Sequence, residues 1–96
     1  MFTHVVCFKL KDRSPEAIEV TRQVLANMEG KIPQLRYIEV GTDVLRSDRS
    51  YDLVLITKFD SQADMEAYQV HPAHLEVGAH MKQVLDGTSV AVDFVG

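Results

Sequence analysis

The segment from Tyr68 to His74, Tyr-Gln-Val-His-Pro-Ala-His, most strongly constrains the fold of this chain. Pro72 disfavours helical geometry at the residue before it, so a helix that contains Tyr68 is expected to end near Val70. Proline is itself well suited to the first position of a new helix. The segment therefore predicts two helices that meet at His71, with a phenol and two imidazoles close to their junction.

The rest of the chain alternates between apolar runs and turn residues, which predicts four strands and one more helix. Ser14 is suited to cap the first helix, and Pro15 to occupy its first position. Ser61 is suited to cap the second helix. The expected strands span residues 2–10, 35–44, 51–59 and 88–95, and the expected helices run from Pro15 to a stop at Gly30, from Ser61 to about Val70 and from Pro72 to about Asp86.

The order of these elements, which is strand, helix, strand, strand, helix pair and strand, predicts the fold class. It is typical of the ferredoxin-like α+β fold, in which an antiparallel sheet carries its helices on one face. The 96 residues contain no linker and no low-complexity segment. We therefore expect a single domain over residues 1–96.

The strands are apolar on both faces, although the helices of this fold cover only one. In the first strand Val5 and Cys7 point to one side and Val6 and Phe8 to the other. A sheet face in contact with water is expected to be polar, so the second apolar face needs a cover. The simplest cover is the same sheet of a second copy, related by a two-fold axis. The alternative is the chain tail or a loop, and of the two we expect the homodimer.

Charge and composition argue against several other roles. The net charge is −4 and no basic run appears, which disfavours nucleic acid or an anionic membrane as a partner. No apolar stretch approaches the ~20 residues of a membrane span, and no secretory segment is visible. The single cysteine, Cys7, cannot form an internal disulfide. We expect a cytoplasmic protein in which Cys7 is a small buried hydrophobe.

His74 is the candidate catalytic base. It falls on the apolar stripe of the third predicted helix, so its side chain is expected to point into the protein. It also lies in the first turn of that helix, where the helix dipole disfavours an imidazolium, and desolvation acts in the same direction. Both effects favour a neutral imidazole, which can act as a base or as a hydrogen-bond acceptor.

Tyr68 and His4 are expected near His74. Tyr68 lies on the inward stripe of the second helix, and His4 shares a strand face with Val6 and Phe8. If that face meets the helices, the three side chains converge on one pocket. Tyr68 is then the second candidate catalytic residue, as an acid or an orienting group, whereas His80 is expected on the solvent side. The predicted pocket lining is His4, Val6, Phe8, Leu25, His71 and Met81, with His71 at the mouth.

Each of these side chains also has a purely structural interpretation, because buried histidines and tyrosines are commonly hydrogen-bonded within the core. A metal site is a weaker alternative. His71 and His74 are three residues apart, but the proline between them breaks the helix, and no known zinc-ligand spacing occurs. Glycine-rich phosphate loops and serine elbow motifs are also absent. We expect no bound metal and no cofactor.

Several short motifs succeed one another along nearly the whole chain. They are His4-Val5-Val6, residues 8–11, Ile32-Pro33, Gly41, residues 50–53, residues 59–61, residues 68–74 and residues 92–94. In this order and spacing they resemble the stress-responsive dimeric α/β-barrel family, the Dabb domain. The resemblance implies a ferredoxin-like monomer whose sheet pairs with the sheet of a second copy, so that the dimer forms an α/β barrel.

The resemblance also implies a place for chemistry. Most family members have no assigned activity, and plant members include stress-associated homo-oligomers. Some plant relatives are polyketide cyclases, in which an inward histidine and a tyrosine do acid–base work on a linear polyketone. By motif match these residues correspond to His74 and Tyr68, and His4 to a histidine that lines the same cavity. The cyclases use aromatic residues on the first helix, where this chain has Thr21 and Leu25, so their activity is not carried over.

These features support three hypotheses. The first is a protein that binds a small molecule, with acid–base chemistry of the cyclase, isomerase or lyase kind; it requires a cavity beside His74 and Tyr68. The second is a non-catalytic, stress-responsive structural homo-oligomer, with a filled core and His74 hydrogen-bonded to the backbone. The third, a cofactor-free monooxygenase-like protein, rests only on analogy with other dimeric ferredoxin-like barrels.

Overall fold

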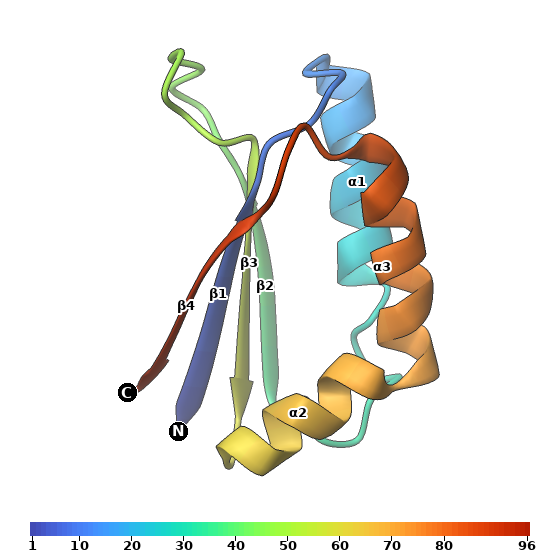
Figure 1. Ribbon diagram of the computed structural model, residues 1–96, viewed down its shortest axis with the longest axis vertical. Helices are drawn as coiled ribbons and strands as arrows, with labels where there is room; N and C mark the ends of the chain where they lie inside the picture. The colour runs from blue at the N-terminus through green and yellow to red at the C-terminus, as the bar shows by residue number, and fades with distance from the viewer.

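The computed structural model describes residues 1–96 and contains the predicted elements in the predicted order (Figure 1). The hydroxyls of Ser14 and Ser61 cap the first two helices, where they accept hydrogen bonds from the backbone N–H of Ala17 and Asp64, each at 3.2 Å. The strands are shorter at their ends than predicted. The elements are β1 (Phe2–Phe8), α1 (Pro15–Ala26), β2 (Tyr37–Thr42), β3 (Leu53–Phe59), α2 (Gln62–Val70), α3 (Pro72–Val84) and β4 (Val90–Val95).

The four strands form one antiparallel sheet in the order β2-β3-β1-β4. In the central strand β1, His4 pairs with Thr57 of β3 on one side and with Asp93 of β4 on the other. All three helices lie on one face of this sheet, with α1 and α3 along it and α2 near the end where the two chain termini lie (Figure 1). The predicted ferredoxin-like α+β fold is confirmed.

The two faces of the sheet differ in their cover, although both carry many apolar side chains. Val6 and Phe8 of β1 point to the helices and are buried. The residues next to them along β1, Val5 and Cys7, point to the other face, on which no helix lies. Val92 and Phe94 of β4 are on that face and are 63% and 47% exposed. The chain tail does not cover this face, because it forms the edge strand β4. We call this face the open face; its apolar residues are Val5, Cys7, Val54, Ile56, Val90, Val92 and Phe94.

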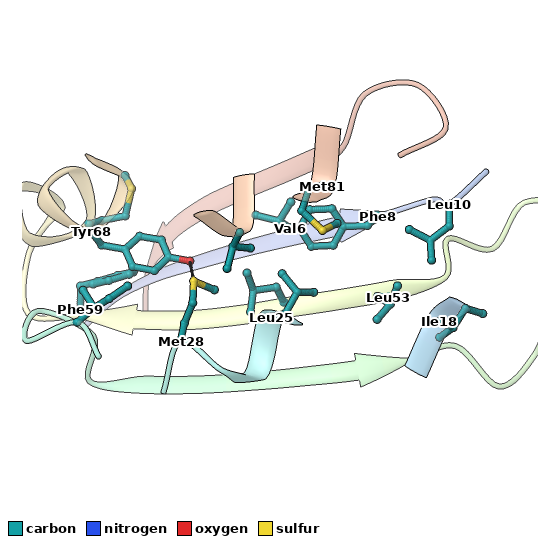
Figure 2. Packing of buried hydrophobic residues seen from close by; sticks show 14 residues of the cluster. Val6, Phe8, Leu10, Ile18, Leu25, Met28, Leu53, Phe59, Tyr68 and Met81 are labelled. Atoms are coloured by element: carbon teal, nitrogen blue, oxygen red, sulfur yellow. Dashed lines mark hydrogen bonds between the residues drawn. The ribbon is translucent and has the colours of Figure 1, made fainter. Parts of the chain in front are cut away.

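The core lies between the sheet and the helices (Figure 2). A cluster of 14 buried apolar residues fills most of this space. Tyr68 of α2 and Phe59 of β3 are its largest fully buried side chains, and their ring centroids are 4.9 Å apart. Because Tyr68 packs on Phe59, the end of α2 has a fixed position relative to the sheet.

Asp52, just before β3, is a fully buried carboxylate. Its Oδ2 accepts a hydrogen bond from the backbone N–H of Leu10 at 2.8 Å, and its Oδ1 accepts from Nε of Arg13 and Nη2 of Arg46, both at 2.9 Å. Burial raises the pKa of Asp52, but the hydrogen bonds from these three donors outweigh it and hold the pKa below 3.8. This group, which we call the Asp52 cluster, joins the β2–β3 loop to the segment between β1 and α1.

Candidate functional site

His71 joins α2 to α3 without a linker. Its backbone is extended, with φ −66° and ψ 140°, as expected for a residue before proline, and it is the cap of both helices. Its Nδ1 accepts a hydrogen bond from the backbone N–H of Ala73 at 3.1 Å. The ring is thus engaged in capping α3, and His71 does not line the cavity beside His74. Its predicted place at the pocket mouth is wrong for this reason.

A cavity of about 320 Å³ lies between the sheet and the helices, beside His74 and Tyr68. Ten of its 15 lining residues are hydrophobic, and its volume is in the range of small-molecule sites, roughly 300–1,000 Å³. The condition that the first hypothesis set is therefore met. The predicted site residues that line this cavity are His4, Val6, Phe8, Leu25, Tyr68, His74 and Met81.

His74 is half-buried in the first turn of α3, and only one of its ring nitrogens has a partner. Nδ1 lies 3.0 Å from the backbone carbonyl oxygen of Gln69. Desolvation is the largest influence on the pKa of His74 and lowers it below 6.5; the hydrogen bond with Gln69 raises it, and the nearby charge of His4 lowers it. The imidazole is therefore neutral near pH 7, in the direction that the sequence predicts.

Tyr68 is fully buried, and its ring centroid lies 4.6 Å from that of His74 with the two planes tilted. Its hydroxyl donates a hydrogen bond to Sδ of Met28 at 3.8 Å, which Figure 2 shows as a dashed line. Burial raises the pKa of Tyr68 well above its ordinary value. The phenol thus keeps its proton and remains a hydrogen-bond donor, held by a weak acceptor.

His4 is buried at the cavity wall, and its Nδ1 contacts Oδ1 of Asp93 on the neighbouring strand. A carboxylate accepts only, so Nδ1 of His4 carries the proton of this hydrogen bond. The sequence alone does not identify Asp93 as part of the site. Its one signal is an acidic residue inside an apolar strand, and the pairing with His4 depends on β4 lying beside β1.

His80 was expected on the solvent side, and this expectation is wrong. The side chain is half-buried, and its Nε2 has neither solvent contact nor a hydrogen-bond partner. Together with Thr21 of α1 and Leu10, it lines a separate cavity of about 270 Å³ between α1 and α3. His80 does not line the cavity beside His74.

The structure also bears on metal ions and membranes. No three histidine, cysteine, aspartate or glutamate side chains lie together in an arrangement that could hold a metal ion. None of the helices has both the length and the apolar character that crossing a membrane requires.

Comparison with known families identifies the family of this chain. The model of the stress responsive A/B barrel domain, Dabb, matches residues 2–95. The chain therefore belongs to the Dabb family, as its motifs indicate. Among curated proteins, no sequence matches this chain significantly.

Solved structures agree with the fold. A dimeric ferredoxin-like protein of unknown function from Thermobifida fusca is 28% identical, covers 97% of this chain and 88% of its own, and has a TM-score of 0.83. A protein from Arabidopsis thaliana is 27% identical over 100% of this chain and 95% of its own, with a TM-score of 0.84. A dimeric protein of unknown function from Bacteroides fragilis is 26% identical over 97% and 93%, with a TM-score of 0.81.

Structures with named activities are more distant. A hydroxynitrile lyase from Passiflora edulis is 20% identical over 97% of this chain and 90% of its own, with a TM-score of 0.79. An antibiotic biosynthesis monooxygenase is 13% identical over 100% and 98%, with a TM-score of 0.74. At these identities the likeness shows a shared fold and assigns no activity to this chain.

Proposed function

We propose that this protein is a homodimer that binds a small carbonyl compound in the cavity and moves a proton on it, with His74 as the base. The observation that carries the proposal is one ring nitrogen of His74 that has no hydrogen-bond partner in the protein, at the wall of a mostly apolar cavity. Cavities of this kind, with a few polar groups in an apolar wall, are typical of small-molecule sites.

The hydrogen bond to Gln69 sets the tautomer of His74. A carbonyl oxygen only accepts, so Nδ1 carries the proton and donates it to Gln69. In the neutral ring the lone pair is then on Nε2. Because the lowered pKa of His74 keeps the ring neutral, Nε2 is available to take a proton from a bound molecule.

Tyr68 supplies the complementary group. In the proposed step, Nε2 of His74 removes a proton from the carbon next to the carbonyl, and the C–H electron pair forms the enolate. The negative charge then lies on the carbonyl oxygen, which can accept a hydrogen bond from the Tyr68 hydroxyl. Only the sulfur of Met28 holds that hydroxyl in the structure, so the change of partner costs little.

His4 is proposed as a positioning residue and a polar contact of the cavity. Its Nδ1 is engaged by Asp93, so its ring orientation is fixed. The other nitrogen, Nε2, has no hydrogen-bond partner in the protein and remains for a ligand. His71 has no part in this proposal, because it caps α3.

The homodimer is supported by the open face and by the two bacterial relatives that are described as dimeric. The apolar side chains of β1, β3 and β4 continue across this face, and the loss of their contact with water would stabilise a face-to-face pair. Val92→Lys places a charge on this face and is expected to yield a monomer. Val20→Lys is the matched control, since Val20 on α1 is similarly exposed, at 55% against 63% for Val92.

The non-catalytic homo-oligomer keeps one observation in its favour. It predicts that His74 is hydrogen-bonded to the backbone, and Nδ1 does have that partner. It also predicts a filled core, whereas about 320 Å³ beside His74 and Tyr68 is empty of protein. The empty space and the free Nε2 together favour binding over a purely structural role.

Deuterium exchange tests the chemistry without knowledge of the natural substrate. Simple methyl ketones are incubated with the protein in deuterated water, and exchange at the carbon next to the carbonyl is monitored by NMR. General-base catalysis contributes about 10²–10⁴-fold, so His74→Gln is expected to lose a factor in that range. Tyr68→Phe is expected to lose less, because it removes a hydrogen bond and leaves the base.

His80→Gln is the matched control, because His80 is on the same helix and does not line the cavity. It is expected to leave the exchange rate unchanged. Equal exchange by the wild type and His74→Gln would refute the role of His74. Native mass spectrometry of the same samples reports the second part of the proposal: a dimer is expected, and a monomeric wild type would contradict it.

A further inference from the structure

Met28 lies between two cavities. The cavity beside His74, which we call the inner cavity, shares two lining residues, Met28 and Val77, with a second cavity of about 160 Å³. We call this second one the outer groove. It is also lined by Asn27 and Lys31, just beyond the end of α1, and by Glu76 of α3, and all three residues are exposed. The two spaces therefore adjoin each other at one methionine and one valine.

Of these two residues, Met28 is the one that can move. A methionine side chain is unbranched and adapts its shape to its surroundings, whereas valine is branched at Cβ and has one strongly preferred rotamer in a helix. Met28 is 1% exposed, and the hydrogen bond that its sulfur accepts from Tyr68 at 3.8 Å is a weak one. Figure 2 shows the side chains of Met28 and Tyr68 facing each other across the core.

We propose that Met28 sets the length of the ligand that this site accepts. In the structure its side chain lines both the inner cavity and the outer groove. When it moves aside, the two spaces join, and an elongated molecule can reach from His74 to Lys31. This inference rests on the proposed function, which assigns the inner cavity to a carbonyl ligand.

The two spaces differ in polarity, and the difference indicates the class of ligand. The inner cavity is mostly apolar, and Tyr68 and Gln69 of its lining lie next to His74. The outer groove offers Lys31 and Glu76, whose charges cancel, and the amide of Asn27, which both donates and accepts. These groups suit an uncharged polar end, such as a hydroxyl or an amide. The expected ligand is thus a linear carbonyl compound whose far end carries such a group.

The test uses two homologous series of linear methyl ketones, one with a terminal hydroxyl and one without. Binding to the full-length protein is measured by isothermal titration calorimetry. For the wild type, affinity is expected to rise about fourfold per added methylene until the inner cavity is full, and then to level off. In Met28→Ala the rise is expected to continue to longer chains, so the longest ketones bind about tenfold tighter or more relative to the short ones.

The terminal hydroxyl provides a second readout. It is expected to improve the binding of long ketones to Met28→Ala, and Lys31→Met is expected to remove that improvement when combined with Met28→Ala. Met28→Val is measured in parallel as a milder truncation, in case Met28→Ala does not fold. Met65→Ala is the matched control, because Met65 is also a buried methionine and lines neither cavity. It is expected to leave the chain-length profile unchanged.

The outcomes separate this inference from the proposed function. If the wild type binds no ketone of any length, the proposed function fails and this inference fails with it. If the wild type binds short ketones but the Met28 variants show the same chain-length limit, only the inference is overturned. The same conclusion holds if Met65→Ala extends the limit as Met28→Ala does.

Discussion

The Asp52 cluster and the cavity beside His74 both hold buried polar groups, but they use them in opposite ways. Both oxygens of Asp52 are occupied, by Leu10 and by the guanidinium groups of Arg13 and Arg46. At the cavity, one ring nitrogen of His74 has no protein partner and the hydroxyl of Tyr68 has only a sulfur. A fully satisfied network holds structure together, whereas polar groups left free beside an empty space are suited to a ligand.

The largest effect on stability is expected in the Asp52 cluster, where the buried polar groups are fully hydrogen-bonded. Asp52→Asn leaves two guanidinium groups without their carboxylate. Because the side chains of Arg13 and Arg46 are 31% and 36% exposed, the loss in the free energy of unfolding is expected near the lower end of the about 3–5 kcal/mol that breaking a buried ion pair costs. Urea denaturation measures this loss. The control is Asp60→Asn, which breaks the exposed pair with Arg36 and is expected to cost about 0–1 kcal/mol. If the two losses were equal, the Asp52 cluster would have no special structural role.

Arg46→Ala is expected to have a smaller effect than Asp52→Asn. It removes one donor from Oδ1 of Asp52 but leaves Arg13 and Leu10 in place. Hydrogen bonds to charged groups contribute about 1.5–3 kcal/mol, and the partial exposure of Arg46 places it near the lower value. Urea denaturation again provides the measurement. A loss as large as that of Asp52→Asn would show that the two arginines act only together.

The Asp52 cluster and the cavity beside His74 are expected to lose stability at different pH values as acid is added. The pKa of His74 is lower in the folded protein than the 6.5 of the free side chain, so below pH 6.5 the unfolded chain binds more protons and stability falls. The pKa of Asp52 is also lowered, from 3.8, so its contribution is present above that pH and is lost as the pH falls through the folded value. Thermal unfolding against pH should show two stages. In His74→Gln the loss of stability just below pH 6.5 should become smaller, and the loss at lower pH should not change.

Tyr68→Phe is expected to have the smallest effect on stability. The ring stays in the core against Phe59, and the lost hydrogen bond to Met28 is a weak one, so the cost is about 0.5 kcal/mol. The exchange of ketone protons should nevertheless fall in the same variant. A large loss of stability would mean that the hydroxyl is a structural group, and the contrast with Asp52 would then disappear.

Local signals in the sequence were sufficient to predict the fold. Ser14, Ser61 and Pro72 each act on the backbone within a few residues, and each begins a helix where it was expected to. The apolar pattern predicted both faces of the sheet, because side-chain direction along a strand alternates with a period of two. These effects depend on neighbours in the sequence, so no knowledge of the tertiary structure was needed.

For the candidate site, the sequence could predict only those side chains whose direction is determined by the period of their helix or strand. Helical spacing was enough to place Tyr68 and His74 inward, and strand alternation was enough to place His4 with them. The partners of these groups lie far away in the sequence or on the backbone. Asp93, for example, meets His4 only because β4 lies beside β1. The wrong expectation for His80 has the same origin, since its cover comes from another helix.

The direct connection of α2 to α3 at His71 makes this segment sensitive to length rather than to composition. Each residue added to an α-helix rotates the residues beyond it by about 100° and moves them by about 1.5 Å. A loop could absorb such a change, but none separates these helices. One residue inserted between Pro72 and His74 would therefore turn the imidazole away from Tyr68. We expect variants of this segment to tolerate many exchanges of side chains and very few insertions or deletions.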